Sequence, residues 1–106
     1  MGASWEGFVI EQLVARLGAE SDECHFWATH SGAELDLLVV RGAARRGFEI
    51  KRTSSPVITP SLRSALSGLN LSSIDVIHAG DQTFELHEHI RAVSVSRLLE
   101  DIKPMH

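Results

Sequence analysis

Two apolar runs, each holding an acidic residue, decide the fold of this chain. Residues 32–40 read Gly-Ala-Glu-Leu-Asp-Leu-Leu-Val-Val and place Asp36 inside the first run. Residues 47–51 read Gly-Phe-Glu-Ile-Lys and place Glu49 inside the second. Both runs have strand composition, and we expect them to pair antiparallel. A carboxylate inside an apolar strand is costly unless it is paired or binds a metal, so the two acids mark a candidate site.

Alternation along each run assigns its side chains to two faces. In residues 34–40, Asp36 lies on the face opposite Leu35 and Leu37, and both faces are largely apolar. We therefore expect a central strand that is covered on both sides. In residues 47–51, Glu49 and Lys51 project to the same side.

Helices and strands alternate around these runs. We expect a helix over residues 4–17, because Ser4 can cap it and Gly18 can end it. A second helix is expected to start at Thr59-Pro60 and to run to about Leu69. The other expectations are strands at 24–30, 74–79, 82–87 and 90–95, the last at an edge, a basic connection over 41–46, and a final helix at 97–102. The sequence thus predicts one α/β domain over residues 1–106, with an α-β-β-β-α-β core and a central mixed sheet flanked by helices.

Composition narrows the class of protein. The 106 residues suffice for one domain, and their 43% hydrophobic content is ordinary for a globular protein. No apolar run approaches the length of about 18 residues that a membrane span needs, and the N-terminal residues lack a signal-peptide pattern. Cys24 is the single cysteine, which excludes an intrachain disulfide. We therefore expect a cytoplasmic protein without a membrane partner.

The net charge and the local charge distribution give opposite indications about nucleic-acid binding. The formal net charge of -4 argues against autonomous DNA binding, because such proteins are usually basic. Half of the ten Lys and Arg residues nevertheless cluster within residues 41–52. They are Arg41, Arg45, Arg46, Lys51 and Arg52. The cluster would be either a basic cleft or a solvated hairpin tip.

The acids suit metal-dependent phosphodiester hydrolysis. Mg²⁺ prefers oxygen ligands and takes only one or two protein carboxylates, which Asp36 and Glu49 would supply, with the backbone carbonyl of Ile50 as a third oxygen. Lys51 could orient the attacking water or stabilise developing negative charge. Helical periodicity places Glu6 on the apolar stripe of the first helix, from where it would complete the metal shell or bind a second metal. The structural alternative is an ion-paired set at a sheet edge.

Other chemistries receive no support from the sequence. The histidines lack a third ligand at zinc spacing, and Cys24 has no evident partner for a thiol mechanism. The chain also lacks the Gly-x-x-x-x-Gly-Lys motif of a P-loop.

An acid followed by acid-x-Lys, in this order of elements, resembles the PD-(D/E)XK nuclease superfamily, whose fold is restriction-endonuclease-like. Leu35 stands where that pattern has proline. Three segments also look like the uncharacterised C-terminal domain of prokaryotic AAA-type ATPases. They are residues 5–13 (Trp-Glu-Gly-Phe-Val-Ile-Glu-Gln-Leu), residues 30–36 (His-Ser-Gly-Ala-Glu-Leu-Asp) and residues 48–51 (Phe-Glu-Ile-Lys).

The resemblance implies that Glu6, Asp36, Glu49 and Lys51 occupy the nuclease signature positions, with Mg²⁺ or Mn²⁺ as cofactor and DNA as substrate. It also implies an ATPase module upstream in the natural polypeptide. The competing hypothesis is a catalytically silent module that regulates such an ATPase or forms a homodimer. A third hypothesis, nucleic-acid binding without hydrolysis, depends on the arginine cluster alone.

Overall fold

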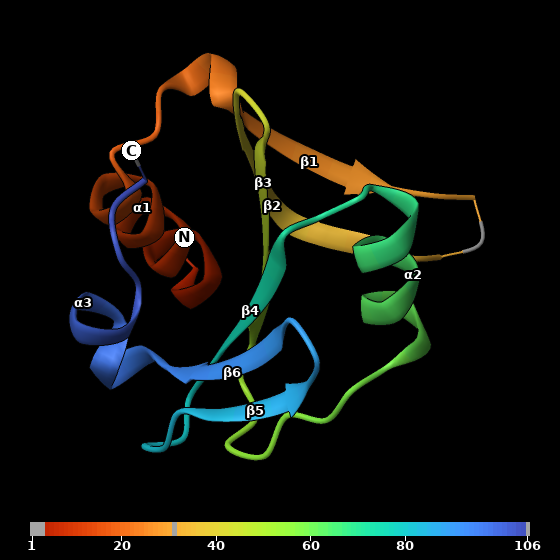
Figure 1. Cartoon of the computed structure of the whole chain (residues 1–106). Helices are drawn as coiled ribbons and strands as arrows, with labels where there is room; N and C mark the ends of the chain where they lie inside the picture. The colour runs from red at the N-terminus through yellow and green to blue at the C-terminus, as the bar shows by residue number, and fades with distance from the viewer. Residues whose placement is uncertain (1–3, 31, 106) are drawn as a thin grey trace.

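The computed structural model describes residues 4–30 and 32–105, and this part of the chain forms a six-stranded sheet with helices on both faces (Figure 1). Its elements are α1 (Trp5–Leu17), a 3-10 turn (Ser21–Glu23), β1 (Cys24–Ala28), β2 (Glu34–Arg41), β3 (Ala44–Lys51), α2 (Pro60–Gly68), β4 (Ser73–His78), β5 (Phe84–His87), β6 (Ile90–Ser94), a second 3-10 turn (Val95–Arg97) and α3 (Leu98–Asp101).

The strands lie in the order β1-β2-β3-β4-β6-β5. The pairs β3–β4 and β4–β6 are parallel, whereas β1–β2, β2–β3 and β5–β6 are antiparallel. The sequence-based prediction of an α/β fold with a mixed sheet is therefore confirmed, as is the antiparallel pairing of the two acid-bearing strands.

Helices α1 and α3 cover one face of the sheet (Figure 1). The Ser4 hydroxyl caps α1 by accepting from the Gly7 amide at 3.0 Å, and Gly18 ends the helix at a φ of 69°, which favours glycine. The buried stripe of α1 is Val9, Leu13 and Leu17. These side chains join a cluster with Leu37, Val39, Phe48, Ile50, Ile77, Val93, Leu98 and Ile102.

Helix α2 covers the opposite face (Figure 1). Thr59 caps it by accepting from the Leu62 amide at 3.2 Å, and Pro60 occupies its first turn. Leu62 and Ala65 are its buried residues. The second cluster adds Leu35, Leu38, Leu71, Ile74, Val76 and Ile90. Apolar packing on both faces is why β2, β3 and β4 are central strands.

Several predicted boundaries were wrong. The expected connection over 41–46 is a tight turn at Gly42 and Ala43, so that Arg45 and Arg46 belong to β3. The strand at 90–94 lies between β4 and β5 rather than at an edge, because β5 pairs along its outer side. The first strand ends at Ala28, and the last helix is a 3-10 turn followed by four residues of α-helix. Ser31, within one of the quoted segments, lies outside the described residues.

Candidate functional site

The candidate site lies where β2 and β3 stop pairing as a regular ladder. Their register runs from the Arg41–Ala44 pair to the Leu37–Phe48 pair. Asp36 and Glu49 are the next residues along the two strands. Beyond Phe48, β3 continues its parallel pairing with β4 through Lys51, so it is β2 that departs from regular pairing at Asp36.

Side-chain carboxylates replace the missing ladder bonds at this point. The Ile50 amide donates to Asp36 Oδ2 at 2.8 Å, and the Asp36 amide donates to Glu49 Oε1 at 3.2 Å. The Asp36 carboxyl group also lies close enough to that of Glu49 to raise the pKa of Glu49. The acids predicted to converge therefore do converge, and each is oriented by a backbone N–H of the other strand.

The departure at Asp36 also changes which way Leu35 faces. Alternation predicts that Leu35 and Leu37 share a face, but Leu35 packs in the α2 cluster whereas Leu37 packs against α1. Gly47 makes room for Leu35. A Cβ built on Gly47 would lie 2.9 Å from Leu35 Cδ1 and 3.0 Å from Leu71 Cδ1. A larger residue two positions before Glu49 would therefore require these leucine side chains to shift.

Glu49 is buried beside a like charge and has one cationic partner. Only 6% of the residue is exposed. Burial is the largest cause that raises the pKa of Glu49 to about 8, followed by the hydrogen bond and the charge of Asp36. Lys51 lowers that pKa, and its Nζ lies 3.5 Å from Glu49 Oε2. The Lys51 side chain is 48% exposed, so its charge is partly screened by solvent. Near neutral pH the Asp36–Glu49 pair therefore retains a proton.

Glu6 does not take the orientation that the helical stripe predicts. It is exposed on α1, and the buried face of this helix is centred on Val9 and Leu13. Within residues 4–30 and 32–105, no group of three His, Cys, Asp or Glu side chains is placed to hold a metal ion. The contact that Ile50 makes at the site comes from its amide, and its side chain is buried on the α1 side.

The remaining donors fit a hard divalent cation that keeps most of its waters. Mg²⁺ needs only one or two carboxylates from the protein. Asp36 and Glu49 offer two carboxylates, which are adjacent and already oriented by backbone amides. The proton that the pair retains near neutral pH indicates that the pair is short of positive charge. A cation would satisfy the paired carboxylates by displacing that proton.

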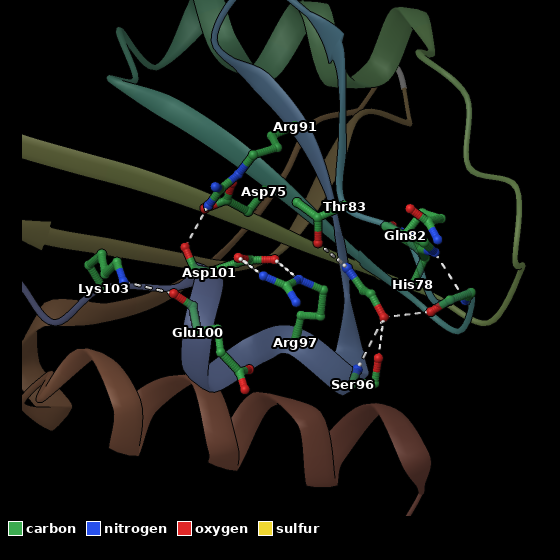
Figure 2. A network of polar contacts seen from close by, with 12 residues as sticks. Asp75, His78, Gln82, Thr83, Arg91, Ser96, Arg97, Glu100, Asp101 and Lys103 are labelled. Atoms are coloured by element: carbon green, nitrogen blue, oxygen red, sulfur yellow. Dashed lines mark hydrogen bonds and ion pairs between the residues drawn. The ribbon is translucent and has the colours of Figure 1, made fainter.

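A second buried acid escaped the sequence analysis. Asp75 in β4 is 3% exposed and contacts two arginines, with Arg46 Nη2 at 3.3 Å and Arg91 Nε at 3.1 Å. Figure 2 shows Arg91 reaching both Asp75 and the backbone carbonyl of Asp101. Asp75 stands between Ile74 and Val76, so the criterion that identified Asp36, an acid in an apolar strand, would have found it too.

Much of the basic cluster is engaged within the molecule. Arg41 donates to Glu23 at 2.8 Å and to the carbonyls of Gly18 and Met105. Arg46 contacts Asp75, and its guanidinium lies 5.3 Å from the centre of the Phe48 ring. Those two arginines hold chain segments together, so they belong neither to a free basic cleft nor to a solvated hairpin tip, the two alternatives that the sequence left open.

Comparison with known proteins identifies the family of this chain. Residues 1–98 match the family described as Domain of unknown function (DUF4143). The chain belongs to this family. It is 44% identical over 99 residues to the uncharacterized protein Rv2008c of Mycobacterium tuberculosis, and equally to the uncharacterized protein Mb2031c of Mycobacterium bovis. The match covers 93% of this chain and 22% of each relative, so the chain spans about a fifth of their length.

No solved structure matches the chain. Among the described residues, no helix is both long enough and apolar enough to cross a membrane.

Proposed function

We propose that this domain is a divalent-metal-dependent nuclease of the PD-(D/E)XK type that hydrolyses DNA phosphodiester bonds. The observation that carries the proposal is the Asp36–Glu49 pair, whose carboxylates each accept an amide of the other strand, with Lys51 at 3.5 Å from Glu49, at the point where β2 leaves its ladder with β3. The α-β-β-β-α-β order of the first elements supports a restriction-endonuclease-like core.

Each residue of the site has a distinct task in this proposal. Asp36 and Glu49 would hold Mg²⁺ or Mn²⁺, and the cation, when bound, would supply Lewis-acid polarisation of the phosphodiester. Lys51 places a positive charge where negative charge develops in the transition state. The backbone amides of Asp36 and Ile50 orient the two carboxylates, which reduces the reorganisation needed for catalysis.

Cleavage of plasmid and single-stranded DNA in Mg²⁺ or Mn²⁺ tests the proposal. The isosteric variant Asp36→Asn and the variant Lys51→Ala should each lower the rate by about a hundredfold or more. Glu34→Gln is a matched control, because Glu34 lies in the same strand but is exposed. Cleavage at an unchanged rate in Asp36→Asn would point to a contaminating nuclease and contradict the proposal.

The second candidate function is a silent regulatory module of an AAA-type ATPase. Phe8 of α1 is 54% exposed and Leu99 of α3 is 60% exposed, and both line a cavity of about 240 Å³ between the two helices. Exposed apolar side chains that border one groove are typical of a protein contact. The mycobacterial relatives are several times longer than this chain, so we propose the ATPase module of the same polypeptide as the occupant.

Binding to a separately produced ATPase module tests this candidate. Leu99→Asp should abolish the binding, because it places a charge in the apolar groove between α1 and α3. Formation of a concentration-dependent homodimer by the isolated domain, lost in Leu99→Asp, would identify a second copy as the occupant instead.

A further inference from the structure

A cavity of about 330 Å³ opens beside Lys51 on the α2 side of the sheet. It is lined by Leu62 of α2 and Val76 of β4. Val76 is the direct partner of Glu49 in the parallel β3–β4 register. Because partner residues in neighbouring strands point to the same face, Glu49 projects toward the face on which the cavity opens, and Lys51, which lines the cavity, lies 3.5 Å from Glu49.

The outer wall of the cavity is held in place by the segment that links β3 to α2. The Ala79 amide donates to the Thr53 carbonyl at 3.0 Å, which attaches the segment to the end of β4. The linking segment also passes close to Gly80, where only a glycine fits, since a Cβ on residue 80 would lie 2.7 Å from the Ser54 carbonyl oxygen. Pro56 is buried and Thr59 caps α2. The cavity is therefore largely formed before any ligand binds.

The lining combines three kinds of group in one small space. Lys51 supplies a cation at the end nearest Glu49, and Thr53 and Ser55 supply hydroxyls. Pro56 and Val57 supply apolar surface, and Val57 is 67% exposed. A nucleotide presents the complementary groups, namely a phosphate, a polar sugar and a flat base with apolar faces. The volume is near the lower end of the range for small-molecule sites, about 300–1,000 Å³, which suits one nucleotide.

We propose that this cavity binds one unstacked nucleotide of a single-stranded DNA whose phosphodiester lies at Asp36, Glu49 and Lys51. The inference deepens the proposed nuclease function and names its substrate class. A base within a duplex must be unpaired and unstacked before it can enter such a cavity, whereas a single strand has already lost most of those interactions. Single strands, including unpaired flaps, are therefore bound in preference to a continuous duplex.

Binding is measured by fluorescence anisotropy with labelled oligothymidylate in the absence of divalent metal, so that the result does not depend on cleavage. Val57→Asp should weaken binding roughly tenfold, because it places a negative charge on the path of the phosphates. Leu99→Asp is the matched control, since it introduces the same charge at a similarly exposed apolar position on the far face, and it should leave the affinity unchanged. Amide resonances of Thr53, Ser54, Ser55 and Val57 should shift on titration with the oligomer.

The outcomes separate this inference from the function on which it depends. Equal binding and equal cleavage of a duplex and a single strand of the same sequence would overturn the inference and keep the nuclease assignment. Single-strand binding that shifts residues 53–57 without cleavage in Mg²⁺ or Mn²⁺ would support the cavity as a binding site and refute the nuclease assignment. An affinity unchanged in Val57→Asp, or undetectable binding by the wild-type domain, would overturn the inference.

Discussion

The sheet contains two buried acids, and their surroundings differ in one decisive respect. Asp75 contacts two arginines, at 3.1 and 3.3 Å, and those arginines also bind backbone carbonyls of the C-terminal segment. Glu49 lies against another carboxylate and has one partly exposed lysine at 3.5 Å. Both acids are at least nine-tenths buried, so burial alone does not distinguish them.

The difference indicates which acid stabilises the fold and which is available for chemistry. A buried charge that is fully paired is a structural group, and removing one partner leaves an uncompensated charge. Two adjacent carboxylates are instead short of positive charge, a condition that is common where a protein binds a cation or transfers a proton. The comparison therefore indicates a structural role for Asp75 and supports the proposed role of Glu49 in a metal site.

The largest expected effect is on stability, in two isosteric variants. Asp75→Asn should lower the free energy of unfolding by about 3 kcal/mol, because Arg46 and Arg91 lose their shared counter-charge. Glu49→Gln should leave stability unchanged or increased at pH 8, since it removes one of two like charges and keeps an acceptor for the Asp36 amide. Urea denaturation at pH 8 measures both. A larger loss in Glu49→Gln than in Asp75→Asn would reverse the two roles.

The second-largest expected effect is on metal binding, which should distinguish Glu49 from Asp75. If Mg²⁺ binds Asp36 and Glu49, a concentration of about a hundred times its Kd adds about 2.7 kcal/mol to the stability. Binding at pH 7 should also release close to one proton, because the pKa of Glu49 is raised to about 8. Calorimetry in buffers of different ionisation enthalpy counts that proton. Asp36→Asn should abolish both effects, whereas Asp75→Asn should retain metal-linked proton release under conditions where it is folded.

The pH dependence of stability sharpens the comparison further. The pKa of Glu49 is raised from 4.5 to about 8 in the folded protein, so between these values the native state binds a proton that the unfolded state has lost. The stabilising contribution of Glu49 is therefore fully present below about pH 4.5 and is lost as the pH rises through about 8, at up to about 1.4 kcal/mol per pH unit between these values. Thermal denaturation from pH 5 to 9 measures the decline, and Glu49→Gln should flatten it. An equal slope in that variant would remove Glu49 as the cause.

The smallest expected effect concerns Glu6. Its side chain is exposed on α1, the helix that covers the face opposite α2, so Glu6→Gln should change the apparent Mg²⁺ affinity by less than about twofold in the same calorimetric experiment. A tenfold loss, which corresponds to about 1.4 kcal/mol, would instead show that Glu6 completes the metal shell as the helical stripe predicts.

Local signals in the sequence were sufficient for much of the fold. The caps at Ser4 and Thr59 located the helix starts, since a hydroxyl in that position binds amides within its own turn. The boundaries that failed depend on distant segments. Arg46 extends β3 because it reaches Asp75 and the carbonyl of Lys103, and β6 lies inside the sheet because β5 pairs along its outer side.

The sequence by itself determined that Asp36 and Glu49 belong to neighbouring apolar strands and that Lys51 shares a side with Glu49, because strand alternation is a local property with a period of two. Only the tertiary structure decided that β2 leaves its ladder at Asp36, that Glu6 is exposed and that Asp75 is neutralised by arginines. Those outcomes depend on register and on packing between segments far apart in the chain. No short window of residues encodes them.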